Sequence, residues 1–125
     1  NQIFNLFVAQ EKKLAAEPAK YQALVRAMAK ANRFMYSNKG KTVEIAMKYA
    51  KIPRDVAEPA YDELVKGKVW SQNGGLPRAK VEYTINRMVQ VGNIKPEGRP
   101  KYEDYVAVSI LEEALKRLPR IPDYD

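Results

Sequence analysis

The apolar positions of this chain recur mostly at the spacing of an amphipathic helix. Pro18 suits the first turn of a long helix, because an N–H group at that position would have no partner inside the helix. The pattern predicts that this helix ends near residues 37–40, and that a short helix over residues 11–16 precedes it. The apolar stripe follows i, i+3, i+4, i+7 spacing and consists of Tyr21, Leu24, Val25, Met28, Ala31 and Met35.

Further helices follow, separated by proline and glycine. We expect one after Gly40 that is broken at residues 51–53, one opened by Pro53, and one opened by Pro77 and ended by Gly92. Pro59 lies inside the helix that Pro53 opens, which predicts a kink near residues 55–58. The inward positions of these three helices are Val43, Ala46, Met47 and Ala50, then Val56, Ala60, Leu64 and Val65, then Val81, Ile85, Met88 and Val89.

The last helix is predicted from a capping-box pattern. Ser109-Ile110-Leu111-Glu112 has the S-x-x-E form that opens a helix before an apolar run. Its inward positions are Ile110, Leu111, Ala114, Leu115 and Leu118. Residues 119–125 contain two prolines and no apolar period, so we expect a loose tail after a helical portion over residues 1–118.

The N-terminal segment differs from the rest. Residues 3–9 form a short, bulky, apolar run that is typical of a buried strand, although a helix lead-in remains an alternative. A lone strand has no partner in an otherwise helical chain, and its backbone groups need one. The fold class is therefore mainly α, with about five to six helices and one short strand-like segment. The simplest explanation of the lone strand is a missing upstream portion or pairing with another copy.

The composition limits the chemistry. The chain has 125 residues, which fits one domain, and it contains neither Cys nor His. It therefore has no disulfides, no thiolate metal site, no imidazole ligand and no histidine general base. No apolar run reaches the roughly 18–20 residues that a membrane span needs. We expect no enzymatic activity, no catalytic residues, no metal and no cofactor.

Charge is concentrated in the first half. Residues 1–54 carry a net charge of +8 and residues 55–125 a net charge of −1, which together give the +7 of the whole chain. Arg26, Lys30 and Arg33 fall on one helix face and are the best candidates for binding nucleic acid. No aromatic residues are interleaved with them for base stacking, so a solvated helix face is the favoured interpretation.

Three other groups have a functional and a structural interpretation each. Glu58, Asp62 and Glu63 can bind a cation, but an exposed acidic face is the simpler interpretation. The Asn73-Gly74-Gly75 segment before Pro77 can cradle an anion, although a plain turn is favoured. Trp70 can line a ligand pocket, but a lone Trp beside a turn is more often a core anchor.

The order of several segments resembles the C-terminal part of the periplasmic solute-binding proteins of nitrate/sulfonate/taurine ABC transporters. These are type 2 periplasmic binding proteins, related to the thiamine-pyrimidine synthases. The resemblance covers nearly all of residues 5–118; each segment alone is unspecific, and it is the ordered set that carries the similarity. The segments are residues 5–9, 13–18, 21–31, 34–36, 46–50, 56–62, 70–74, 88–92 and 105–115.

The resemblance implies a scaffold role. Whole members of that family have two α/β lobes with a ligand cleft between them, and they deliver a solute to a membrane permease in the periplasm. The segment present here would be a crossing strand followed by helices on the outside of one lobe. The ligand-contacting residues of the family have no counterparts in this chain, so the ligand-binding residues stay unknown. Helices built to cover a lobe keep an uncovered apolar face, which predicts self-association of this chain.

The sequence thus predicts a scaffold portion of a solute-binding protein, with a small solute and a permease as the partners of the full-length protein and no nucleic acid. A free-standing basic helical module that binds nucleic acid or an anionic surface is the alternative.

Overall fold

A computed structural model describes residues 6–122 of the chain. Within that range the fold is mainly helical, which confirms the predicted class, and it contains no strand. The α-helices are α1 (Glu11–Ala16), α2 (Pro18–Ser37), α3 (Lys39–Ala50), α4 (Arg54–Lys66), α5 (Arg78–Gln90) and α6 (Val108–Lys116). Two 3-10 turns, η1 (Pro96–Gly98) and η2 (Tyr102–Asp104), connect α5 to α6. No helix in residues 6–122 is long and apolar enough to cross a membrane.

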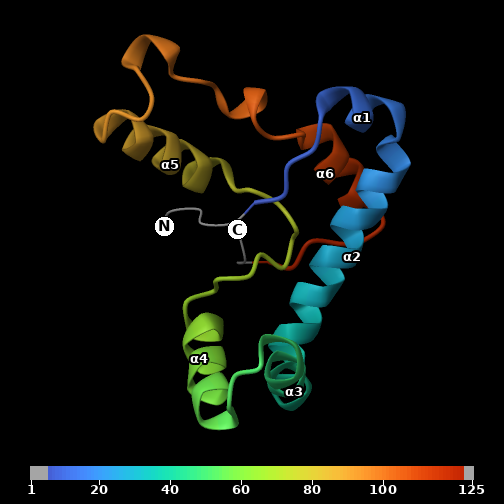
Figure 1. Ribbon diagram of the computed structural model, residues 1–125. Coiled ribbons are helices and arrows are strands. Elements are labelled where there is room, and N and C mark those ends of the chain that lie inside the picture. The colour runs from blue at the N-terminus through green and yellow to red at the C-terminus, as the bar shows by residue number, and fades with distance from the viewer. Residues whose placement is uncertain (1–5, 123–125) are drawn as a thin grey trace.

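The helices form an open arrangement around α2 (Figure 1). Helix α2 runs lengthwise as a spine, with α3 and α4 at one end and α1 and α6 at the other. Helix α5 stands to one side, and among the helical elements it packs chiefly on η2.

Proline and glycine set the helix boundaries much as the sequence predicts. Pro18 is the first residue of α2, whereas Pro53 and Pro77 occupy the position immediately before α4 and α5. Gly92 follows α5 with φ of 79°, a left-handed conformation that glycine adopts without steric cost. Helix α4 continues through Pro59 as one helix.

Two small apolar clusters and the contact between α2 and α6 make up the core. The Tyr61 cluster contains Val43, Ala57 and Tyr61, with Met47, Ile52, Val65 and Trp70 packed against it. The Tyr102 cluster contains Val81, Ile85 and Tyr102, with Leu76, Val106 and Val108 packed against it. Ala29 of α2 and Ala114 of α6 are fully buried, and the two helices are in contact.

Several sequence predictions are wrong in the described region. Residues 6–9 have no regular structure, because the described chain offers no strand to pair with; residues 3–5 of the predicted strand lie outside that region. On α4 the predicted inward position Val65 is confirmed, because it packs against the Tyr61 cluster. The predicted Val56 and Ala60 are exposed, and Ala57 and Tyr61 are buried in their place. Helix α6 begins at Val108 with Ala107 as its N-cap, so Ser109 lies inside the helix and caps nothing.

Candidate functional site

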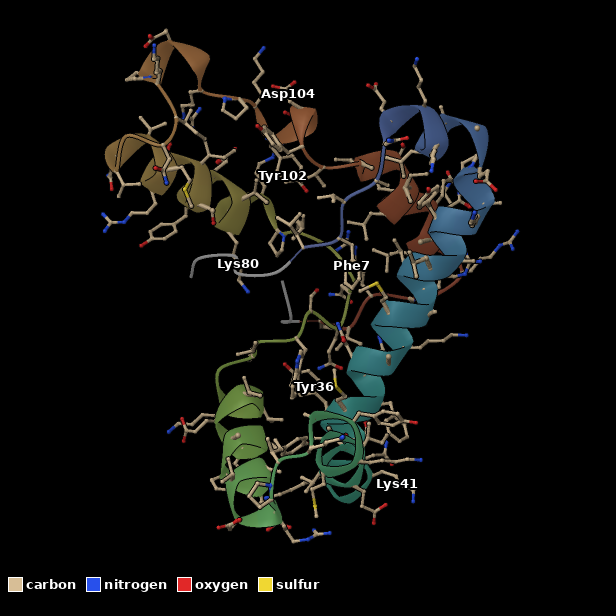
Figure 2. The ribbon with its side chains drawn as sticks, in the orientation of Figure 1. Phe7, Tyr36, Lys41, Lys80, Tyr102 and Asp104 are labelled. Carbon is tan, nitrogen blue, oxygen red and sulfur yellow. The ribbon has the colours of Figure 1, made fainter. Side chains whose placement is uncertain are left out.

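The most buried polar side chain lies in the loop between α4 and α5. Asn73 is 1% exposed, and the loop segment around it, residues 70–75, lies against α2. Three side chains of α2 hold the loop through its backbone carbonyls. Asn32 Nδ2 donates to Ser71 O at 2.6 Å, Arg33 Nε to Gln72 O at 2.9 Å, and Tyr36 Oη to Trp70 O at 3.0 Å. Figure 2 shows Tyr36 on the side of α2 that faces this loop and α4.

The same loop holds the segment that follows α6. Asn73 Nδ2 donates to Ile121 O at 3.1 Å, and Ile121 N donates to Asn73 Oδ1 at 2.9 Å. Arg33 Nη2 donates to Pro119 O at 2.7 Å. Residues 119–121, which the sequence predicts as the start of a loose tail, are thus tied to α2 and to the loop; residues 123–125 lie outside the described part.

The Asn73-Gly74-Gly75 segment is a turn packed on a helix. Gly74 has φ of 67°, and a Cβ placed on it would lie 3.2 Å from the Cβ of Ala29. A Cβ on Gly75 would lie 2.7 Å from Leu111 Cδ2. These glycines therefore allow the loop to approach α2 and α6 closely, which favours the plain turn over an anion cradle.

Trp70 is a core anchor. Its ring lies edge-on to Tyr36 with centroids 5.9 Å apart and is tilted against Tyr61 at 6.2 Å. Tyr61 Oη in turn donates to Met35 O at 2.6 Å. The indole therefore joins α2, α4 and the loop and lines neither of the surface hollows described below.

The predicted basic face of α2 is divided. Lys30 is exposed and Arg26 is half-buried, whereas the Arg33 guanidinium is held by the carbonyls of Gln72 and Pro119. Arg33 thus stabilises the fold and is withdrawn from the face on which the sequence placed it. The remaining two cations form a smaller positive surface than the one predicted.

The carboxylates of α4 are engaged by cations. Lys39 Nζ lies 2.6 Å from Asp62 Oδ1, and Arg54 Nη1 lies 2.8 Å from Glu58 Oε1. The hydrogen bond to Asp62 raises the pKa of Lys39. Glu63 Oε1 lies 3.9 Å from Lys66 Nζ. Within residues 6–122 no group of three or more carboxylates is arranged to hold a metal ion, so nothing in the described residues supports the alternative of a cation site.

One surface hollow lies beside Tyr102, with a volume of about 240 Å³. Figure 2 shows Tyr102 between α5 and η2, where its hydroxyl donates to Leu76 O at 2.8 Å. Burial raises the pKa of Tyr102. The hollow is lined by Gly75, Leu76, Pro77, Arg78, Tyr102, Leu111 and Arg120.

The charge around this hollow is balanced. The Arg78 guanidinium stacks on the Tyr102 ring with its carbon 4.3 Å from the ring centroid, and it pairs with both Glu82 and Glu103. The hydrogen bond from Arg78 lowers the pKa of Glu103, and the same bond raises the pKa of Arg78. Two carboxylates face Arg78, and Arg120 also lines the hollow, so two cations and two anions surround it.

A second hollow lies where α2 meets α3, with a volume of about 380 Å³. It is lined by Phe34, Lys41, Glu44, Ile45, Lys48 and Tyr49. The apolar stripes of the sequence do not predict this hollow, because Phe34 and Ile45 fall outside them. The sequence does contain a pattern that indicates this face of the helix. Its residues lie at i, i+3, i+4 and i+7, and they are Lys41, Glu44, Ile45 and Lys48.

Comparisons of the chain with protein-family models, with curated proteins and with solved structures gave no match. The resemblance to solute-binding proteins therefore stays a prediction from the sequence.

Proposed function

We propose that the chain is a helical covering layer of a larger protein, and specifically the scaffold portion of a periplasmic solute-binding protein that captures a small solute for an ABC transporter. In this proposal the chain has no catalytic role, and the ligand cleft lies largely outside it. The single observation that supports the covering role is the solvent-accessible surface of the chain, which is larger than a compact protein of this mass exposes. The assignment to solute-binding proteins rests on the ordered sequence resemblance.

The surface of the chain is larger than that of a compact protein of its mass. It amounts to 9111 Å², against the roughly 6,800 Å² that a folded monomer of this mass exposes. Setting aside ~1,300 Å², the most that eight residues can expose, for the residues outside 6–122 still leaves an excess on the order of 1,000 Å². That excess is comparable to the ~800 Å² that each partner buries in a standard interface.

Much of the uncovered surface is apolar. Phe7 and Val8 are 77% and 84% exposed, and Tyr105 is 69% exposed. Val56, Val69, Tyr83 and Val91 are each more than half exposed on different elements. Leu6, Phe7 and Val8 are consecutive and all exposed, and a contiguous exposed apolar patch marks a surface that a partner covers.

The alternative, a basic module that binds nucleic acid, has less support. Arg33 would be central to such a surface, but its guanidinium is engaged by backbone carbonyls. Binding would therefore depend on Arg26 and Lys30, which is fewer cations than a nucleic-acid site normally gathers.

The proposal is tested by comparing two proteins: the full product of the gene that encodes this chain, and residues 1–125 alone. Each is melted in the presence of small anions, sulfonates, aromatic carboxylates and pyrimidines. A solute at about 100 times its Kd adds about 2.7 kcal/mol to stability. We expect one solute to raise the melting temperature of the full product and none to do so for residues 1–125.

Two results would contradict the proposal. One is a gene product with no α/β portion beyond these residues. The other is a solute that stabilises residues 1–125 as strongly as it stabilises the full product, because the cleft would then lie in this chain. A photo-crosslinker at Tyr105 adds a separate test of the covering role. It should join Tyr105 to another part of the same polypeptide, whereas a crosslinker at the polar, exposed Glu97 should not.

A further inference from the structure

The hollow between α2 and α3 lies on a face that the described core does not use. Val43 and Met47 of α3 point into the Tyr61 cluster. Ile45 and Tyr49 are 49% and 74% exposed, and Phe34 of the last turns of α2 is 43% exposed. Figure 2 shows Lys41 on the side of α3 that faces away from α4. The hollow is therefore separate from the packing that holds α3 in place.

The hollow is shallow and its floor is apolar. Phe34 contributes an aromatic ring from α2, while Ile45 and Tyr49 are one helical turn apart on α3. Its volume of about 380 Å³ lies at the lower end of the ~300–1,000 Å³ range of protein ligand pockets. A hollow of this size can take up one large side chain. A bilayer surface is flat and would fill it less well.

The rim of the hollow is positively charged. Lys41 Nζ lies 2.9 Å from Glu44 Oε2, and the hydrogen bond from Lys41 lowers the pKa of Glu44. Lys41 and Glu44 thus neutralise each other. The second lysine, Lys48, has its Nζ 5.2 Å from the centroid of the Tyr49 ring, beside the apolar floor. One excess positive charge stands next to an exposed apolar surface, within a half of the chain that has a net charge of +8.

We propose that this hollow docks an acidic peptide segment of a protein partner. A large apolar side chain of the segment enters between Phe34, Ile45 and Tyr49, and a neighbouring carboxylate pairs with Lys48. Charge complementarity favours this occupant, because the lining carries two lysines and one glutamate and lies in a half of the chain with a net charge of +8. The inference is independent of the solute-binding proposal, since it concerns a surface outside any cleft.

The experiment is a selection from a random-peptide phage library on the wild-type chain, followed by binding measurements with the selected peptides as synthetic probes. We expect the peptides to combine one large apolar residue with adjacent Asp or Glu. Ile45→Ser and Lys48→Glu should each weaken binding by about tenfold or more, the effect of losing one good contact. Val56→Ser and Lys66→Glu are matched controls on α4, at similarly exposed positions, and should change the Kd by less than about twofold, since surface changes away from a site have small effects.

Several outcomes would overturn the proposal. They are the absence of any selected peptide, selection of basic peptides, and peptides whose Kd is the same for Ile45→Ser and for the wild type. Binding to anionic phosphatidylglycerol vesicles that Ile45→Ser abolishes, without peptide binding, would assign the hollow to a membrane instead. Self-association that Ile45→Ser alone abolishes would assign it to a second copy. Circular dichroism of each variant establishes that it is folded before binding is compared.

Discussion

The side-chain amide of Asn73 and the backbone of Ile121 form a reciprocal pair of hydrogen bonds, although 48 residues separate them in sequence. Asn73 Nδ2 donates to Ile121 O at 3.1 Å, and Ile121 N donates back to Asn73 Oδ1 at 2.9 Å. The amide thus takes the place of a backbone peptide group and fixes the segment after α6 against the loop. Both partners lose their hydrogen bonds if the amide is removed.

Replacing Asn73 by Ala should therefore destabilise the chain. The change leaves the N–H and C=O groups of Ile121 without these partners, and a buried polar group left unpaired costs about 1–3 kcal/mol. Urea denaturation, followed by circular dichroism, measures the loss. Asn93→Ala is the control, because Asn93 is exposed, and it should change the free energy of unfolding by less than about 0.5 kcal/mol. Equal effects of the two substitutions would contradict the structural role of Asn73.

Two glycine-to-alanine changes should have opposite effects on stability. A Cβ on Gly75 meets Leu111 Cδ2 at 2.7 Å, so Gly75→Ala forces the end of the flexible Leu111 side chain to move and should cost about 1 kcal/mol, the low end of overpacking costs. A Cβ on Gly40, inside α3, meets nothing within 4 Å, so Gly40→Ala should stabilise the chain by about 0.5–1 kcal/mol. Thermal melting of both variants checks the signs. A stabilising Gly75→Ala would contradict the close packing of the loop on α6.

Glu103 should titrate below its ordinary value of 4.5, because Arg78 donates a hydrogen bond to its carboxylate. A carboxyl whose pKa is lowered by folding adds stability above its unfolded pKa, and this contribution is lost as the pH falls through the folded pKa. NMR of the side-chain carboxyl carbon measures the titration directly. Arg78→Gln should raise the pKa of Glu103, and Arg87→Gln, on the same helix, should leave it unchanged. If Arg78→Gln leaves the pKa of Glu103 unchanged, the ion pair between Arg78 and Glu103 is contradicted.

The sequence predicts the helices well because their limits depend on local chemistry. Pro18, Pro53, Pro77 and Gly92 restrict the backbone near their own positions, and the structure places helix ends at or beside each of them. The 3.6-residue period likewise reports the buried Val81 and Ile85 of α5.

The sequence predicts the long-range contacts poorly because no local pattern encodes them. The sequence predicts Arg33 to be a surface cation. In the structure its guanidinium donates a hydrogen bond to the carbonyl of Pro119, 86 residues later, which no local pattern predicts. The inward face of α4 was predicted from Val56, whereas the aromatic packing of Tyr61 with Trp70 brings Ala57 and Tyr61 inside. The partner of Arg33 and the inward face of α4 both depend on tertiary contacts, which the spacing of apolar residues does not specify.

The central claim is that this chain alone leaves an apolar surface that requires a partner. Sedimentation velocity of residues 1–125, together with binding of an apolar-surface dye, tests this most directly. The account predicts a species of at least twice the 14.3 kDa chain mass, or dye binding that disappears when the covering partner is present. A monodisperse monomer that binds no dye at any concentration would contradict it.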